Sequence, residues 1–265
     1  MKLQDKVIIV TGGGNGIGKA LCERFQQEAP AAVIVSDIDA VSAEQVAHAI
    51  GGHAVACDVA NESQIRDLIT TTEAQFGRVD VFCANAGIVS RGGAEADHAS
   101  WQRTMDVNFM SHVYSARAVL PGMLKRKSGY LLHTASAAGL LTQIGSAPYA
   151  VSKHAAVAFA EWLSITHGDQ GILVSCLCPM GVWTEMLNDD DPAVKALHAD
   201  AMQPSDVAEA VVQGMEEERF LILPHKEVER FFRNKSRDYD GWIGKLRKNA
   251  AQLSSPDVIT KDSEP

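Results

Sequence analysis

Short apolar segments alternate along the chain with longer segments of helical period. Some of the short segments, such as Val7–Val10, are apolar at consecutive positions rather than at every second position. That pattern is typical of strands in a sheet that helices cover on both faces. The predicted strands are Val7–Val10, Ala32–Ser36, Ala54–Cys57, Val79–Ala84, Tyr130–His133, Ile172–Leu177 and Phe220–Leu223.

Helices are predicted between these strands, with Asn61 and Ser205 as expected N-caps. The regular alternation of strand and helix predicts right-handed crossovers and a parallel, doubly wound Rossmann-type sheet. A length of 265 residues is ordinary for one such α/β domain. The predicted helices are Ile17–Gln27, Ser42–Ile50, Glu62–Phe76, Ala99–Arg126, Tyr149–Gly168 and Pro204–Glu217.

The charge distribution separates a C-terminal extension from the rest of the chain. The net charge of −9 argues against nucleic acid as a partner, because phosphate binding needs a basic face. From Lys226 to Lys248, however, eight Lys or Arg stand against four Asp or Glu, a local +4. We therefore divide the chain into residues 1–223 and a basic, aromatic extension, 224–265, whose end from Ser254 is expected to be disordered.

Composition also bears on compartment and on metal binding. No apolar run is long enough to span a bilayer, and Met1–Lys6 does not resemble a signal region, so we expect a cytoplasmic protein without stable membrane insertion. Cys176 and Cys178 share one face of a predicted strand, which could suggest a metal site. Because no second pair accompanies them, we interpret all five cysteines as buried thiols and predict no metal.

Five glycines lie within Thr11–Gly18, which we call the glycine turn, between the first strand and the first helix. Glycine allows backbone angles that a Cβ forbids and lets a ligand approach the main chain closely. The N-terminus of the following helix attracts phosphate. A tight structural turn is the alternative for an isolated glycine cluster, but the strand–turn–helix context favours a pyrophosphate site.

Asp37 follows the second strand, about twenty residues after the glycine turn, as expected of a ribose-binding acid. There it would repel the 2′-phosphate of NADP, and its neighbours Ser36, Ile38 and Asp39 include no basic residue. We therefore predict NAD as the cofactor, with NADP the less favoured alternative. The other interpretation of Asp37 is that it caps the next helix.

The glycine spacing, Gly12-x-x-x-Gly16-x-Gly18 after Thr11, resembles the cofactor turn of the short-chain dehydrogenase/reductase family. Further motifs follow in that family's order over about residues 5 to 223. They are Asn85-Ala86-Gly87, Asn108, Ser136, the Tyr-x-x-x-Lys pair Tyr149 and Lys153, and Pro179–Thr184, which we call the nicotinamide segment. The resemblance implies a nicotinamide-dependent oxidoreductase.

The resemblance also implies which residues bind the cofactor. Asp58 is similar to the family's adenine-contacting acid, with Val59 packing on the ring, although Asp58 could instead cap the helix that begins near Asn61. The expected cofactor-binding residues are Gly12, Asn15, Gly16, Ile17, Gly18, Asp37, Asp58, Val59, Asn85, Ala86, Gly87, Tyr149, Lys153, Pro179, Gly181, Val182 and Thr184.

Catalytic roles follow from the same resemblance. Tyr149 is expected to act as general acid/base, Ser136 to orient the substrate oxygen, and Asn108 to hold a water that relays the proton. The spacing itself places Lys153 one helical turn from Tyr149. A tyrosine titrates near 10, so we expect the charge of Lys153, together with the oxidised nicotinamide, to lower the pKa of Tyr149.

Two departures from the family pattern concern assembly and the cofactor site. Many members end with a strand and an Asp-Gly-Gly stretch, where this chain has Leu221–His225 followed by the basic tail. That difference puts the usual tetramer packing in doubt. The second departure, Phe82-Cys83-Ala84 before Asn85 where the family often has another Asn, is minor. The family's long helices commonly pair between subunits, which implies a homodimer or homotetramer.

The segments expected to border the nicotinamide are mostly apolar and contain no arginine, which favours an apolar secondary alcohol or ketone as substrate. Glu185–Met202 is expected to form a lid, although its cluster Asp189–Pro192 is more simply a solvated loop tip. The aromatic tail, Glu227–Leu246, is expected to cover the pocket or contact a second subunit. Contact with a membrane surface is the less favoured alternative, because it would need a longer and stronger apolar face. The alternatives to an NAD-dependent enzyme are an NADPH-dependent carbonyl reductase and a non-catalytic nucleotide-binding regulatory protein. The bordering segments are Ile88–Val89, Ala137–Leu141, Ala147–Pro148, Val182–Trp183 and Met186–Leu187.

Overall fold

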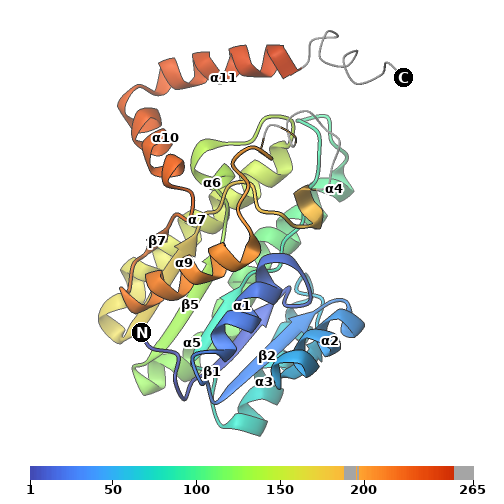
Figure 1. Ribbon diagram of the computed structural model, residues 1–265, viewed down its shortest axis with the longest axis vertical. Coiled ribbons are helices and arrows are strands. Elements are labelled where there is room, and N and C mark those ends of the chain that lie inside the picture. Colours follow the sequence, from blue (N-terminus) through green and yellow to red (C-terminus); the bar gives the residue numbers. More distant parts are fainter. Residues whose placement is uncertain (188–194, 196, 254–265) are drawn as a thin grey trace.

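The computed structural model describes residues 1–187, 195 and 197–253, and a parallel sheet of seven strands forms its centre (Figure 1). The strand order is β3-β2-β1-β4-β5-β6-β7, so the chain changes direction between β1 and β4. The predicted doubly wound, Rossmann-type sheet is confirmed. The strands are β1 (Val7–Thr11), β2 (Ala32–Asp37), β3 (His53–Ala56), β4 (Val81–Ala84), β5 (Gly129–Thr134), β6 (Ile172–Leu177) and β7 (Leu221–Ile222).

Helices cover both faces of the sheet. One apolar core packs α1, α2 and α9 against the sheet, and the other packs α3, α5 and α7 against its opposite face. Because both faces are covered, every residue of β1 is buried, as its consecutive apolar residues predict. The helices are α1 (Gly16–Gln26), α2 (Ala40–Ile50), α3 (Glu62–Phe76), α4 (His98–Met105), α5 (Ser111–Arg126), α6 (Ala138–Leu141), α7 (Ala147–His167), α9 (Pro204–Glu216), α10 (Lys226–Arg237) and α11 (Tyr239–Leu253).

Two expected helix caps can be compared with the structure. Asn61 is the N-cap of α3, and its side chain accepts hydrogen bonds from the backbone N–H groups of Ser63 and Gln64. The prediction for Ser205 is wrong, because α9 already begins at Pro204 and Gln203 is its N-cap. Proline is well suited to the first helical position, where its missing N–H has no intrahelical partner.

The long helix predicted over Ala99–Arg126 is divided. A π-helical segment, Asp106–Met110, separates α4 from α5, and the backbone N–H of Ser111 donates to the carbonyl of Asp106. Such segments are uncommon and concentrate at functional sites. The prediction of one continuous helix is therefore wrong at Asn108, which lies in the middle of this segment.

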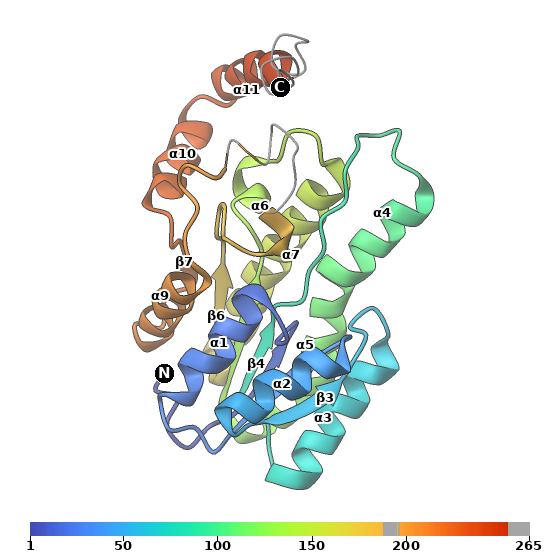
Figure 2. The same cartoon turned by 45° about the vertical axis from the view of Figure 1, so that its right-hand side comes forward.

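The C-terminal extension forms two helices, α10 and α11, and α11 lies beyond the end of the sheet (Figures 1 and 2). Val228 of α10 is fully buried in the core, and the ring of Phe231 lies 6.3 Å from that of Trp242. Phe232, Tyr239 and Ile243 are instead exposed, so the predicted aromatic face is split between the protein interior and the surface. The predicted disordered end, from Ser254, lies outside the described residues.

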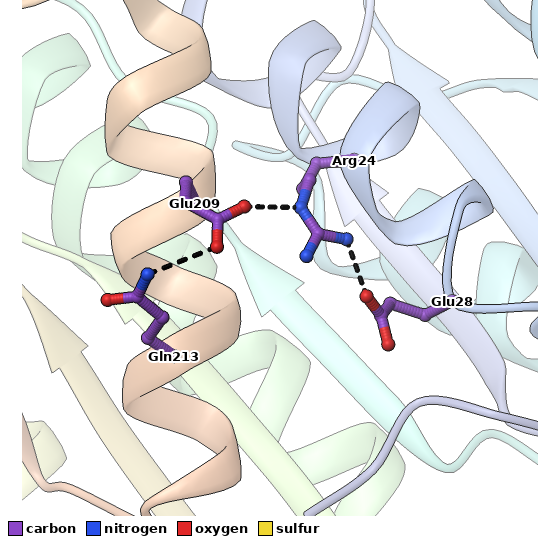
Figure 3. Close-up of polar contacts among 4 residues, drawn as sticks. All are labelled: Arg24, Glu28, Glu209 and Gln213. Atoms are coloured by element: carbon purple, nitrogen blue, oxygen red, sulfur yellow. Dashed lines mark hydrogen bonds and ion pairs between the residues drawn. The ribbon is translucent and has the colours of Figure 1, made fainter.

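A polar contact joins the helix after β1 to the helix before β7. Arg24 of α1 donates to Glu28, just past the end of that helix, at 2.6 Å and to Glu209 of α9 at 2.7 Å (Figure 3). Gln213 donates to the other carboxylate oxygen of Glu209 at 3.1 Å. These contacts lie at the edge of the apolar interface between α1 and α9.

Two expectations from composition concern the described helices and the cysteines. None of the described helices is both long and apolar enough to cross a membrane. All five cysteine side chains are buried. Cys176 and Cys178 share one face of the chain at β6, with their sulfur atoms 3.8 Å apart.

Candidate active site

A cavity of about 430 Å³ lies at the carboxyl ends of the strands, where the strand order changes direction. This is the position at which doubly wound sheets bind ligands. Of the predicted site residues, Asn108 alone does not line the cavity. The lining includes Gly12, Asn15, Gly16, Ile17, Gly18, Asp37, Asp58, Val59, Asn85, Ala86, Gly87, Ser136, Tyr149, Lys153, Pro179, Gly181, Val182 and Thr184.

The glycine turn is held by close backbone packing. Gly12 has a φ of +64°, and a Cβ there would lie 2.9 Å from the Cα of Ala86. A Cβ on Gly18 would collide with the carbonyl of Gly12. Glycine is therefore required at both positions, at Gly12 by conformation as well as by space.

The first turn of α1 fits an anionic group. Asn15 is the N-cap, but among the described residues its side chain makes no capping hydrogen bond, and the first turn contains no acidic residue. The N–H groups at this end of α1 face the cavity side of the glycine turn with a positive dipole. This chemistry suits the pyrophosphate of a dinucleotide.

The structure separates the two interpretations of Asp37. The N-cap of α2 is Asp39, which accepts a hydrogen bond from the backbone N–H of Val41 at 3.0 Å. Asp37 lines the cavity and accepts from the backbone N–H groups of Gly14 at 2.9 Å and Asp39 at 3.1 Å. Because Asp39 does the capping, the carboxylate of Asp37 is positioned by the glycine turn and directed to the cavity.

Asp58 is likewise not the cap of the helix that follows it. Asn61 caps α3, whereas Asp58 forms an ion pair with Arg103 of α4 at 3.3 Å. Both side chains line the cavity. Sequence reasoning missed Arg103, because nothing in the pattern shows that a side chain of α4 reaches Asp58, 45 positions earlier in the chain.

Asn85 connects three strand ends. Its amide nitrogen donates to the carbonyl of Thr11 at 3.0 Å, and its amide oxygen accepts from the hydroxyl of Thr134 at 3.1 Å. The hydroxyl of Thr11 in turn accepts from the backbone N–H of Asn85 at 3.0 Å. Asn85 thus fixes the ends of β1, β4 and β5 around the cavity with its polar side chain.

Ser136, Tyr149 and Lys153 come together on one wall of the cavity. Tyr149 and Lys153 are one turn apart on α7, with the Lys153 Nζ 5.8 Å from the centre of the Tyr149 ring. Lys153 is buried and donates to the carbonyl of Thr134 at 3.0 Å. The hydroxyl of Ser136 accepts from the backbone N–H of Ala138 at 3.1 Å, which fixes its position beside the cavity.

Known proteins share this fold. Residues 6–195 match the family model described as short chain dehydrogenase. The chain belongs to the short-chain dehydrogenase family. The predicted family membership is confirmed.

Relatives in the family include named dehydrogenases. 1-deoxy-11-beta-hydroxypentalenate dehydrogenase of Streptomyces exfoliatus is 33% identical over 237 residues, covering 86% of each chain. Meso-2,3-butanediol dehydrogenase of Serratia marcescens is 32% identical over 192 residues, covering 71% of this chain and 76% of the relative. A short chain dehydrogenase/reductase from Burkholderia phymatum, crystallised in complex with NAD, has a TM-score of 0.81 at 26% identity. That alignment covers 91% of this chain and 96% of the other.

In this short-chain dehydrogenase, burial acts on both members of the Tyr149–Lys153 pair. Burial raises the pKa of Tyr149, and the side chain that acts to lower it is Ser136, through hydrogen bonding. Burial also lowers the pKa of Lys153 to about 8. Desolvation thus disfavours the charged form of each group. The expectation that Lys153 and the oxidised nicotinamide together lower the pKa of Tyr149 concerns the complex with cofactor and stays a prediction.

The side chain of Asn108 is engaged by protein groups. Its amide oxygen accepts from the backbone N–H of Ile88 at 2.8 Å, and its amide nitrogen donates to the carbonyl of Ile88 at 2.8 Å and the hydroxyl of Ser152 at 3.1 Å. Both amide hydrogens are thus used. Asn108 ties the chain after β4 to α7. Its expected role in holding a relay water stays a prediction.

The substrate end of the cavity is mostly apolar, as expected. It also includes Arg91, so the expectation of a wall without arginine is wrong, because the loop after Val89 turns back to the cavity. Of the expected bordering residues, Gly139, Leu140, Leu141, Ala147, Pro148 and Trp183 do not line it. Asp189–Pro192 of the predicted lid lies outside the described residues. The lining at this end comprises Ile88, Val89, Arg91, Ala137, Ala138, Gln143, Ile144, Gly145, Ser146, Met180, Glu185, Met186, Leu187 and Leu197.

A pair of buried histidines lies behind the catalytic wall. The Nδ1 atoms of His112 on α5 and His133 on β5 are 2.8 Å apart, and the rings are stacked. Burial lowers the pKa of His133 to about 4 and holds that of His112 well below its usual value. Both histidines are therefore neutral at neutral pH, and sequence reasoning gave no indication of this pairing.

Proposed function

We propose that the protein is an NAD-dependent oxidoreductase that transfers a hydride between an apolar secondary alcohol, or its ketone, and the nicotinamide. The observation that carries this proposal is that one cavity joins Asp37 and the glycine turn to Ser136, Tyr149 and Lys153. A nucleotide-binding protein without catalysis has no physical need for that wall. The hydroxyl compounds in the names of two relatives, a hydroxypentalenate and a butanediol, support the reaction class.

The cofactor fits the groups present. The glycine turn and α1 would hold the pyrophosphate, Asp37 the adenosine ribose hydroxyls, and the nicotinamide segment the opposite end. Lys153 uses one N–H on the carbonyl of Thr134, which leaves two for the nicotinamide ribose. When bound, the nicotinamide supplies the hydride acceptor or donor.

The protein's residues would handle the proton. The Ser136 hydroxyl donates to the substrate oxygen and directs it to the Tyr149 hydroxyl, which takes the alcohol proton in oxidation and returns it in reduction. Since burial raises the pKa of Tyr149, the phenolate needs nearby positive charge, which Lys153 and an oxidised nicotinamide both provide. The rate of oxidation should therefore increase with pH through the pKa of Tyr149 in the complex.

Replacement of the tyrosine tests the mechanism. Tyr149→Phe removes the proton acceptor while keeping the ring, so we expect kcat to fall by about a hundredfold or more with cofactor affinity retained. Nicotinamide absorbance during oxidation of a panel of secondary alcohols measures the change. Tyr239→Phe, on the exposed face of α11, is the matched control and should keep normal turnover. Near-normal turnover of Tyr149→Phe would overturn the mechanism.

Replacement of the acid tests the cofactor. Asp37→Ala should reduce kcat/KM for NAD relative to NADP by about tenfold, because charge-assisted hydrogen bonds to the ribose are lost. Asp39→Ala is the control: it removes the cap of α2 and so lowers stability, but leaves the preference between cofactors unchanged. If the wild-type enzyme prefers NADP and Asp37→Ala leaves that preference unaltered, the NADPH-dependent alternative replaces our proposal.

The apolar lining supports the proposed substrate class. Ile88, Ile144 and Met186 offer no partner for a polar skeleton, whereas Gln143 and Arg91 can contact a polar substituent. A panel of aliphatic alcohols, cyclic terpenoid alcohols and hydroxysteroids, tested with both cofactors, measures this preference. Sugars and short polyols turned over more efficiently than these compounds would contradict the assignment.

We further infer a homodimer or homotetramer. Trp162 and Ile165 on α7 are 54% and 85% exposed, although large apolar side chains are usually buried. A second copy of α7 would cover them. Sedimentation of the wild type and of Trp162→Glu measures the assembly, and a monomeric wild-type enzyme would contradict it.

A further inference from the structure

His225 is a buried histidine that the catalytic wall does not include. It lies three residues after the end of β7 and is the N-cap residue of α10, in the stretch where the sequence departs from the family's Asp-Gly-Gly pattern. Its side chain is only 3% exposed. It does not line the cavity but lies behind the nicotinamide segment, which does.

Both ring nitrogens of His225 are bonded to the nicotinamide segment. The backbone N–H of Met180 donates to Nδ1 at 3.1 Å, and Nε2 lies 3.0 Å from the carbonyl oxygen of Gly181. A backbone N–H can only donate and a carbonyl can only accept. Nδ1 is therefore unprotonated and Nε2 carries the hydrogen, so the two contacts together require a neutral ring in one tautomer.

The contacts of His225 hold the chain just after β6, where it no longer pairs with β7. The last ladder bond on this side runs from the backbone N–H of Cys178 to the carbonyl of Ile222 at 2.9 Å. Residues 178–181 lie beyond the end of β6 and belong to no strand. The carbonyl of Gly181 also accepts from the backbone N–H of Met202 at 3.0 Å. What His225 adds to this support is the acceptor for the backbone N–H of Met180, so its Nδ1 helps to set how the Met180–Gly181 backbone faces the cavity.

We propose that His225, in its neutral form, is a positioning residue that holds the Met180–Gly181 backbone in the shape that receives the nicotinamide. Protonation would place an N–H on Nδ1 against the N–H of Met180 and release that contact. The chain thereby gains an acid-sensitive contact at the nicotinamide end of the cavity. This inference rests on the proposed function, since it assigns His225 to the same site.

Burial and the groups around His225 act on its pKa in opposite directions. Burial is the largest influence and lowers the pKa. The hydrogen bond to the Gly181 carbonyl, the carboxylate of Glu227 on α10, and the backbone and carboxylate of Asp200, before α9, act to raise it. The net effect is a lowered pKa, so the ring of His225 is neutral at neutral pH. The contact between Met180 and Nδ1 is then lost when the pH falls below the usual histidine range. The folded protein excludes a proton that the unfolded chain accepts, and stability therefore also falls with pH below about 6.5.

Two substitutions test the roles of the two ring nitrogens one at a time. In His225→Asn the amide oxygen replaces Nδ1 as acceptor for Met180 at every pH, whereas His225→Gln offers a donor near the place of Nε2 and loses the Nδ1 acceptor. Isothermal titration measures the dissociation constant of NAD between about pH 8 and about pH 5.5. Hydrogen exchange of Met180, without any cofactor, measures the contact itself.

We expect wild-type affinity for NAD to weaken about fivefold on acidification, and Met180 to exchange faster. His225→Gln should show the weaker affinity and faster exchange already at pH 8, whereas His225→Asn should show no acid weakening. Val228→Ala, which opens a cavity under α10 without touching either bond, should lower the melting temperature and keep the wild-type pH dependence.

The outcomes distinguish this role from the proposed function. If wild-type protein binds NAD and His225→Asn weakens with acid as the wild type does, or His225→Gln binds as tightly at pH 8, the role of His225 is overturned. If wild-type protein binds neither NAD nor NADP at any pH, the proposed function fails, and with it the link to the nicotinamide. Unchanged exchange at Met180 in His225→Gln rejects the anchoring contact in either case.

Discussion

The glycine turn and the nicotinamide segment border the same cavity, but the structure holds them in different ways. At the glycine turn the backbone itself leaves no space: a Cβ on Gly18 would collide with the Gly12 carbonyl. At the nicotinamide segment, the backbone of Met180 and Gly181 is held by the side chain of His225, which lies 45 and 44 positions away in sequence. Steric exclusion fixes one end, and long-range hydrogen bonds fix the other.

This difference determines what each end tolerates. The glycine turn depends on residue size and backbone angle, which do not change with pH or salt. The nicotinamide segment depends on the protonation state of one histidine. We therefore expect substitutions at the glycine turn to cause large losses of cofactor affinity, and changes at the nicotinamide segment to produce smaller effects that vary with pH.

Gly18→Ala should have the largest effect. The added methyl group has to displace the Gly12 carbonyl or the Asn85 amide, both of which hold the ends of strands. We expect affinity for NAD to fall by about a hundredfold and the melting temperature to drop, since overpacking of this kind costs about 1–3 kcal/mol or more. Titration calorimetry and thermal unfolding measure the two effects.

Gly168→Ala is the matched control for that experiment. A Cβ on Gly168 meets no heavy atom within 4 Å, and its φ of −56° suits alanine. The change should leave cofactor affinity unaltered and stabilise the protein slightly. If Gly18→Ala bound NAD like Gly168→Ala, steric exclusion would not explain the glycine turn.

Lys235→Met tests the substrate wall of the cavity, next to the nicotinamide segment. Its effect on the kinetics should be smaller than the effect of Gly18→Ala on affinity. The buried Nζ of Lys235, on α10, donates to the carbonyl of Leu140 at 2.6 Å. Leu140 belongs to α6, and neighbouring Ala137 and Ala138 line the substrate end. We expect KM for the alcohol to rise about tenfold, with the dissociation constant of NAD unchanged, because a charge-assisted hydrogen bond is lost on the substrate side alone.

Steady-state kinetics with saturating NAD, together with titration of NAD alone, separate the two constants. Lys245→Met makes the same substitution at an exposed position of α11 and should change neither. A parallel loss of NAD affinity in Lys235→Met would mean that α10 stabilises the whole cavity rather than its substrate wall.

The same contrast explains how much the sequence predicts. The glycine turn, Asp37 and the Tyr149–Lys153 pair could be located because their constraints are local: a glycine spacing, a strand end, and one helical turn. The strand pattern was equally local, and all seven strands lie within about two residues of their predicted bounds.

Long-range side-chain contacts could not be predicted in this way. His225 gave no signal, because its partners are two backbone groups of a segment before α9. The π-helical segment at Asn108 was missed for a similar reason, since the side chain of Asn108 is bonded to the backbone of Ile88, 20 positions earlier in the chain. Hydrophobic periodicity continues through that segment and does not indicate the interruption.

The smallest effect is expected where the two halves of the fold meet, at Arg24. This side chain joins α1, which follows the glycine turn, to Glu209 of α9, which follows the nicotinamide segment (Figure 3). Glu209 is about half exposed, so solvent weakens the pair, and exposed pairs contribute about 0.2–1 kcal/mol. Arg24→Met should therefore lower the free energy of unfolding by no more than about 1 kcal/mol.

A double-mutant cycle with Glu209→Gln, measured by urea unfolding at low and high salt, isolates the pair. The hydrogen bond from Arg24 lowers the pKa of Glu209, so the contribution is present above the ordinary carboxyl range and is lost as the pH falls below it. NAD affinity should stay unchanged, because each end of the cavity has its own support. A weakening of NAD binding in Arg24→Met larger than the loss in stability would show instead that the ends are coupled through α1 and α9.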